Sequence, residues 1–145
     1  MVLVANLMKK RILVVDDDPA IGKAFRCALR DYEVRVENDP KAAIDVAKEF
    51  RPDVFLVDLI MPDIPGNLLA QNIMCEPKLR EVPIIFVSGV VHTRDQIVEP
   101  VWIGPFPAFG KPFCIHALRR CIARQIGDNS ADYGERTKGA RLMDN

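Results

Sequence analysis

Five polar residues stand at or directly after the ends of short apolar runs: Asp16, Asp17, Asp58, Ser88 and Lys111. Three carboxylates held close together repel one another, and each raises the pKa of its neighbours unless a cation lies between them. Clustered carboxylate oxygens suit a hard divalent ion such as Mg²⁺, which keeps several of its water ligands. A hydroxyl and an ammonium opposite such an ion would complete a site for a phosphoryl group, because phosphoryl transfer needs mainly positioning and charge neutralisation.

The elements that must bring these residues together are predicted strands. Five apolar runs alternate with helix-like segments, at residues 11–15, 33–37, 53–57, 83–87 and 105–110. The first, third and fourth runs are apolar throughout, which is typical of central strands covered on both faces. "EVRVE" (33–37) alternates and is expected near an edge. The two prolines of "PFPAFG" (105–110) predict a short, irregular strand at the other edge.

This alternation predicts a flavodoxin-like α/β fold: a doubly wound, five-stranded parallel sheet of order 2-1-3-4-5 with helices on both faces. Right-handed crossovers then place the carboxyl ends of the strands along one edge, which is the usual ligand crevice. The five polar residues are therefore expected to meet at that edge.

Helix start signals support the same order of elements. Asp18 before Pro19, and Asp39 before Pro40, each combine a capping residue with a proline suited to the first helical position. The first of these helices should bury Ala20, Ile21, Ala24, Phe25, Ala28 and Leu29, and the second Ala43, Ile44, Ala47 and Phe50. Further helices are predicted over 66–76, 92–99 and 112–126.

Length and charge limit the class of protein. The 145 residues suit one domain, expected over 8–126, with a dispensable extension over 1–7 and a flexible tail over 127–145. The 20 basic and 20 acidic residues balance, so no direct binding to nucleic acid or an anionic membrane is expected. No apolar run approaches the roughly 18 residues of a membrane span, and the N-terminal apolar stretch is too short for a signal-peptide core. A cytoplasmic protein is therefore expected.

The cysteines, the histidines and the single tryptophan are not predicted to be catalytic or metal-binding residues. The four cysteines (Cys27, Cys75, Cys114 and Cys121) form no Cys-x-x-Cys pair, so we interpret them as reduced, mostly structural thiols, with a zinc site as the alternative. His92 and His116 are interpreted as ordinary helix residues, and Trp102 as a packing residue.

Four motifs occur in order along the chain: "VVDDDP", "LVDLIMPDIPG", "VSG" and "GKPF". With them, the chain over residues 8–126 resembles a response-regulator receiver domain, the phospho-acceptor module of two-component signalling. The most specific part is the Asp-x-x-Met-Pro-x-x-x-Gly pattern that begins at Asp58 and ends at Gly66. The resemblance implies transfer of a phosphoryl group from a sensor histidine kinase or a histidine phosphotransfer protein, followed by signalling through a changed interaction surface to another protein.

The resemblance also assigns roles. Asp58 matches the phosphorylated aspartate, a covalent nucleophile. Asp16 and Asp17 match the acidic pair that binds Mg²⁺ together with Asp58, and Ile60 matches a position whose backbone carbonyl also coordinates the metal. Lys111 matches the lysine that contacts the phosphoryl oxygens, often followed by a cis proline, and Ser88 matches the hydroxyl residue that moves on activation. Gly89 is small and leaves room for the phosphoryl group. The implied chemistry is limited to the domain's own phosphorylation and dephosphorylation, so an enzyme acting on other substrates is not expected.

The chain departs from the family at two places. Many receivers carry Tyr or Phe three residues before the lysine, where this chain has Ala108. By strand alternation, Phe109 should face the opposite way and Phe106 the same way as Ala108, so either Phe106 substitutes or the switch works without an aromatic. Whether Phe106 or Phe109 acts as an aromatic switch stays open. The apolar Ile60 and Val90 occupy positions that often assist the hydrolytic water, which predicts a long-lived phospho-aspartate.

Alternative readings remain for the site. The three acids from Asp16 to Asp18 would suit a solvated loop with Asp18 as a helix cap, and Lys111 alone would be a surface lysine. A haloacid-dehalogenase-type phosphatase also uses an aspartyl nucleophile and Mg²⁺, but it needs a second aspartate two residues later, where Ile60 stands. A phosphorylation-independent interaction module is the other rival. The sequence does not distinguish a stand-alone regulator from a part of a longer chain.

Overall fold

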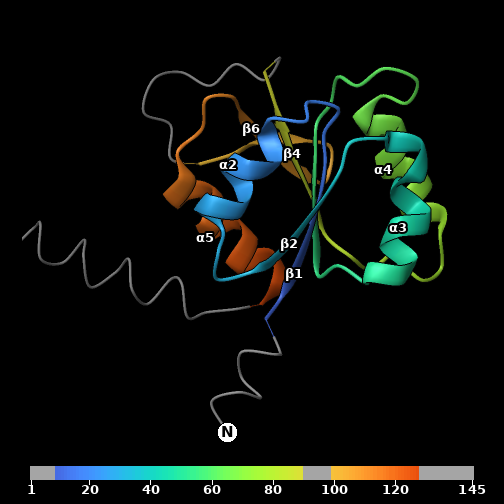
Figure 1. Cartoon of the computed structure of the whole chain (residues 1–145), viewed down its shortest axis with the longest axis horizontal. Helices are drawn as coiled ribbons and strands as arrows, with labels where there is room; N and C mark the ends of the chain where they lie inside the picture. Colours follow the sequence, from blue (N-terminus) through green and yellow to red (C-terminus); the bar gives the residue numbers. More distant parts are fainter. Residues whose placement is uncertain (1–8, 90–98, 128–145) are drawn as a thin grey trace, which may run out of the picture.

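The computed structural model describes residues 9–89 and 99–127 (Figure 1). Three predicted segments therefore lie outside the described residues: the extension over 1–7, the tail from 128 onward, and the helix over 92–99 apart from Glu99. None of the helices that are described is long and apolar enough to cross a membrane.

The described part of the chain is built on a six-stranded sheet of order β2-β1-β3-β4-β6-β5. The strands are β1 (Arg11–Val15), β2 (Glu33–Glu37), β3 (Val54–Val57), β4 (Ile84–Ser88), β5 (Val101–Ile103) and β6 (Phe106–Gly110). Strands β2, β1, β3, β4 and β6 run parallel to one another, whereas β5 runs antiparallel to β6. The parallel core therefore has the predicted order, with the fifth predicted strand appearing as β6.

The predicted edge position of the fifth strand is wrong. β6 has five residues and pairs with β4 on one side and with the extra strand β5 on the other. Gly104 has φ 60, in the left-handed region that glycine adopts without strain, so the chain reverses between Ile103 and Phe106 and forms a hairpin. The same hairpin leaves Trp102 61% exposed, so its predicted packing role is also wrong.

Helices cover both faces of the sheet, as predicted (Figure 1). On one face lie α2 (Ile21–Ala28) and α5 (Ile115–Ile126), and on the other lie α3 (Ala43–Phe50) and α4 (Gly66–Cys75). A short 3₁₀ turn, η1 (Pro40–Ala42), precedes α3, and Asp39 caps it by accepting a hydrogen bond from the Lys41 amide at 3.0 Å.

The predicted start of α2 needs correction. The Asp18 carboxylate accepts from the Ala20 amide at 3.0 Å, but the helix begins at Ile21, two residues after the predicted first position, Pro19. Asp18 therefore closes a turn before the helix instead of capping it, and Pro19 is not its first residue. Ala20 and Ala24 are exposed, contrary to the prediction, while Phe25 and Leu29 are buried as predicted.

Two apolar clusters, one on each face, hold the helices to the sheet. Alternate residues of β1 divide between them: Leu13 and Val15 face α3 and α4, and Ile12 and Val14 face α2 and α5. Every residue of β3 and β4 is buried, as expected for central strands, whereas β2 at the edge is only partly buried. The strand that precedes Asp58 is thus fixed on both faces.

Candidate functional site

The predicted site residues follow strands whose carboxyl ends lie at one edge of the sheet. Backbone hydrogen bonds continue past the strand ends and align these residues. The Asp58 amide donates to the Val15 carbonyl at 3.0 Å, and the Lys111 amide donates to the Ser88 carbonyl at 3.1 Å. The parallel pairing of β1, β3, β4 and β6 therefore brings together residues that are up to 95 positions apart in the sequence.

Three carboxylates meet at this edge. Asp16, Asp17 and Asp58 each offer one oxygen, and these oxygens all lie within 4.8 Å of one another. Asp16 is buried, Asp58 is half-buried and Asp17 is exposed, so the cluster opens to solvent on one side. Hard oxygen donors with an open side fit a divalent ion such as Mg²⁺, which binds through few carboxylates and retains water.

Lys111 is the cation of the cluster. Its Nζ lies 2.7 Å from Asp16 Oδ2 and 3.7 Å from Asp58 Oδ2, and its side chain is only 24% exposed. The peptide bond between Lys111 and Pro112 is cis, as the motif predicted. The ammonium offsets part of the charge that three neighbouring carboxylates would otherwise leave at the sheet edge.

The loop after Asp58 depends on a glycine. The Gly66 amide donates to the Leu59 carbonyl at 2.9 Å, which closes the loop onto the end of β3. A Cβ built on Gly66 would lie 2.1 Å from the Asp58 carbonyl oxygen and 2.8 Å from Leu59 Cα. These are backbone atoms that cannot rotate away, so only glycine fits the observed loop.

Ile60 contacts the Asp58 carboxylate through its backbone. Its amide donates to Asp58 Oδ1 at 3.3 Å, and its side chain is 62% exposed. This contact orients the carboxylate from the loop side. Coordination of a metal by the Ile60 carbonyl stays a prediction.

Ser88 ends β4 and is 1% exposed, so its hydroxyl is held inside the edge of the sheet. Gly89 follows it, and an added Cβ there would meet no described atom within 4 Å. The described residues therefore leave space at Gly89, where room for the phosphoryl group was predicted. Val90 and His92 lie outside the described residues.

The aromatic residues near β6 lie as strand alternation predicted. Ala108 is fully buried in the cluster under α3 and α4, and Phe109 is buried in the cluster under α2 and α5. Phe106 packs on the Ala108 face, edge-on to Phe86 with ring centroids 5.4 Å apart. Phe106 is thus the aromatic side chain of β6 on that face.

Sequence reasoning missed Asn38. Its side-chain amide donates to the Asp16 carbonyl at 2.8 Å and to the Asp18 carbonyl at 3.4 Å, so it ties the acidic loop to the end of β2. Asp16 Oδ1 also accepts from the Asp18 amide at 3.0 Å. The available signal was the position of Asn38, which directly follows a predicted strand at the same sheet edge.

The cysteines give no support to the zinc alternative. Cys27, Cys75 and Cys114 are exposed, and Cys121 is buried; all four are free. Within residues 9–89 and 99–127, no cysteine belongs to a cluster of three potential metal ligands. Burial raises the pKa of the Cys121 thiol to about 11, which fits a structural role, whereas the exposure of the other three contradicts the expectation of mostly structural thiols.

Known proteins resemble this chain in sequence. The model of the response regulator receiver domain matches residues 12–123. The polar-differentiation response regulator DivK of Brucella anthropi is 27% identical over 124 residues, covering 83% of this chain and 99% of that protein. A protein-glutamate methylesterase/protein-glutamine glutaminase of Agrobacterium fabrum is 35% identical over 107 residues, covering 70% of this chain but only 30% of that protein.

Solved structures show the same fold. The receiver domain of a sensor histidine kinase from Pseudomonas aeruginosa, with a magnesium ion coordinated in its active-site cleft, has a TM-score of 0.68 at 27% identity and covers 82% of this chain and 98% of its own. Chemotaxis protein CheY4 of Vibrio cholerae has a TM-score of 0.67 at 23% identity, covering 81% and 98%. These neighbours confirm the flavodoxin-like architecture, and the match over residues 12–123 shows that the chain belongs to the response regulator receiver domain family.

Proposed function

We propose that Asp58 is the residue of this receiver domain that accepts the phosphoryl group, in a reaction that depends on Mg²⁺. The metal would be held by Asp16, Asp17, Asp58 and the carbonyl of Ile60. The observation that carries the proposal is the carboxylate cluster within 4.8 Å, with the Lys111 ammonium against two of its members. This arrangement supports the roles of Asp58 as nucleophile, of Asp16 and Asp17 as metal-binding pair, and of Lys111 as the cation that contacts the phosphoryl group.

The chemistry follows from these positions. An oxygen of Asp58 attacks the phosphorus of a donor phosphohistidine, the P–N bond breaks, and the imidazole leaves with its electron pair and takes up a proton. Asp58 then carries an acyl phosphate. Lys111 neutralises the phosphoryl oxygens, and Ser88 supplies a hydrogen-bonding hydroxyl. When bound, Mg²⁺ supplies further charge neutralisation at the same oxygens.

The donor would be a sensor histidine kinase or a histidine phosphotransfer protein, and the receiver of the signal another protein. We place the exchange in the cytoplasm, where the four free cysteines would stay reduced. Continued hydrolysis of other phosphate esters is not expected, because Ile60 stands where a phosphatase of this chemistry needs an acid.

Incubation with acetyl phosphate and Mg²⁺, followed by intact mass measurement, tests the proposal. The mass should rise by one phosphate per chain, and replacing Mg²⁺ with EDTA should reduce the gain at least about tenfold, because charge neutralisation is a main source of catalysis in phosphoryl transfer. No gain, either from acetyl phosphate or from a cognate kinase, would favour a phosphorylation-independent interaction module. Sustained turnover of a phosphomonoester would favour the phosphatase.

Substitution of Ile60 by asparagine should speed loss of the phosphoryl group several-fold. The Ile60 amide lies 3.3 Å from Asp58 Oδ1, and the 62% exposed apolar side chain of the same residue cannot hydrogen-bond a water beside the nucleophile. An amide side chain there can hydrogen-bond the attacking water. Decay of the phosphorylated form can be followed by intact mass. Leu68→Asn, which changes an exposed apolar side chain on α4, is the matched control, and equal decay rates in the two variants would contradict the prediction.

A further inference from the structure

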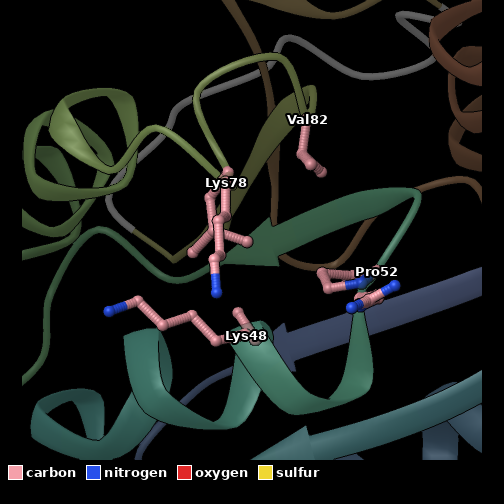
Figure 2. Close-up of a pocket in the computed structure, with 7 residues that line it drawn as sticks. Lys48, Pro52, Lys78 and Val82 are labelled. Carbon is pink, nitrogen blue, oxygen red and sulfur yellow. The ribbon is translucent and has the colours of Figure 1, made fainter.

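A cavity lies away from the carboxylate cluster, near the amino ends of β3 and β4 (Figure 2). It has a volume of about 330 Å³ and lies between the end of α3, the start of β3 and the turn before β4. Its lining residues are Ala47, Lys48, Arg51, Pro52, Lys78, Leu79 and Val82. The strands of the sheet separate this cavity from Asp58, which follows the opposite end of β3.

The lining divides into an apolar floor and a cationic rim. Ala47, Pro52 and Leu79 are buried and Val82 is half-buried, so together they form an apolar surface. The rim carries three exposed basic side chains, Lys48, Arg51 and Lys78. Figure 2 shows Lys78 reaching from the turn toward α3, where Lys48 lies, so the cations come from elements far apart in the sequence.

The rim has more positive than negative charge. Lys48 lies 3.2 Å from Glu76, which offsets one cation. In the part of the chain that the structure describes, neither Arg51 nor Lys78 has a carboxylate within ion-pair distance. Like charges that line one concave surface raise the local concentration of counter-ions, so this cavity attracts anions.

Arg51 occupies a position that favours other residues. It ends α3 with φ 54 and ψ 66, a left-handed conformation that glycine or asparagine adopts more readily. Its amide donates to the Ala47 carbonyl at 2.8 Å, a bond that any residue would make. The helix end therefore does not require arginine, whereas a cavity that holds an anion gains a planar guanidinium able to bind two oxygens at once.

We propose that this cavity binds a small organic anion in which an apolar body carries a phosphate or carboxylate group. The volume of about 330 Å³ falls within the range of small-molecule sites, about 300–1,000 Å³. The apolar body would cover Leu79 and Val82, and the anionic group would contact Arg51 and Lys78. The cavity is distinct from the carboxylate cluster, because its rim is positively charged and it lies at the other end of β3.

An NMR titration of the whole chain without Mg²⁺ tests the proposal with phenyl phosphate and sodium benzoate as probes. Both should produce saturable shifts at the amides of Arg51, Leu79 and Val82. Benzyl alcohol, which lacks the charge, and inorganic phosphate, which lacks the apolar body, should each bind at least about tenfold more weakly. Tighter binding of phenyl phosphate would assign the ligand to phosphates, and tighter binding of benzoate to carboxylates; either result supports the site.

Charge variants make the test specific. Arg51→Asn with Lys78→Gln should weaken binding about tenfold, and asparagine suits the left-handed backbone, so the fold is retained. Lys23→Gln with Arg30→Asn removes the same charge from exposed positions in and just after α2 and should leave binding unchanged. Equal binding by both double variants, or shifts that never saturate, would overturn the proposal. Saturation by a blocked Glu-Phe-Glu peptide but by neither aromatic anion would also overturn it, in favour of a protein segment.

Discussion

Replacement of Asp58 by asparagine should abolish the gain of phosphate from acetyl phosphate and Mg²⁺ while leaving the chain folded. An amide oxygen does not form an acyl phosphate, so the covalent product is lost completely. The side chain keeps its size and can still accept from the Ile60 amide, which lies 3.3 Å from Asp58 Oδ1. Removing one of three neighbouring carboxylates also lessens repulsion, so the melting temperature without Mg²⁺ should stay the same or rise.

Intact mass and a thermal melt measure both parts of this prediction. Asp63→Asn is the matched control, because Asp63 lies in the same loop, with φ 70, but pairs on the surface with Lys41 at 3.8 Å. Its phosphate gain should equal that of the unaltered chain. A folded Asp58→Asn variant that still gained a phosphate would show that another residue is the acceptor.

Replacement of Gly66 by alanine should lower the free energy of unfolding by about 3 kcal/mol or more, since overpacking against rigid atoms is among the most costly substitutions. The added Cβ would lie 2.1 Å from the Asp58 carbonyl oxygen, so the loop or the end of β3 must move. Because the same movement displaces Asp58, phosphate uptake should also fall. Denaturant unfolding and the mass assay measure the two effects.

Gly22→Ala is the matched control for Gly66→Ala, and it should change the free energy of unfolding much less. The nearest atom to a Cβ on Gly22 is Val36 Cγ2 at 3.1 Å, a side-chain atom that can shift. Gly22 lies within α2, where alanine favours the helix by about 1 kcal/mol, so the net change should stay within about 1 kcal/mol. If Gly66→Ala proved as mild as Gly22→Ala, the loop after Asp58 would have to be less constrained than the structure indicates.

The parallel core and the cluster could be predicted because each depends on local patterns. Uninterrupted apolar runs mark β1, β3 and β4 as central, and right-handed crossovers then fix where Asp16 and Asp58 must meet. The close contact of Lys111 with Asp16 could not be predicted, because it depends on side-chain conformations across strands that are distant in the sequence.

The hairpin of β5 and β6 was missed for a different reason. Val101–Ile103 is too short to show periodicity, and its pairing depends on the reversal at Gly104, where φ is 60. Asn38 was missed because a single exposed asparagine after a strand has no distinctive spacing, and its bond to the Asp16 carbonyl is visible only in the fold.

The location of the phosphoryl group is the most direct test of the central proposal. Borohydride reduces an acyl phosphate to an alcohol, so the phosphorylated chain can be reduced, cleaved into peptides and sequenced by mass spectrometry. The proposal predicts homoserine at position 58 and unaltered aspartate at Asp16 and Asp17. Homoserine at either member of the acidic pair, or a phosphate found on a histidine instead, would contradict it.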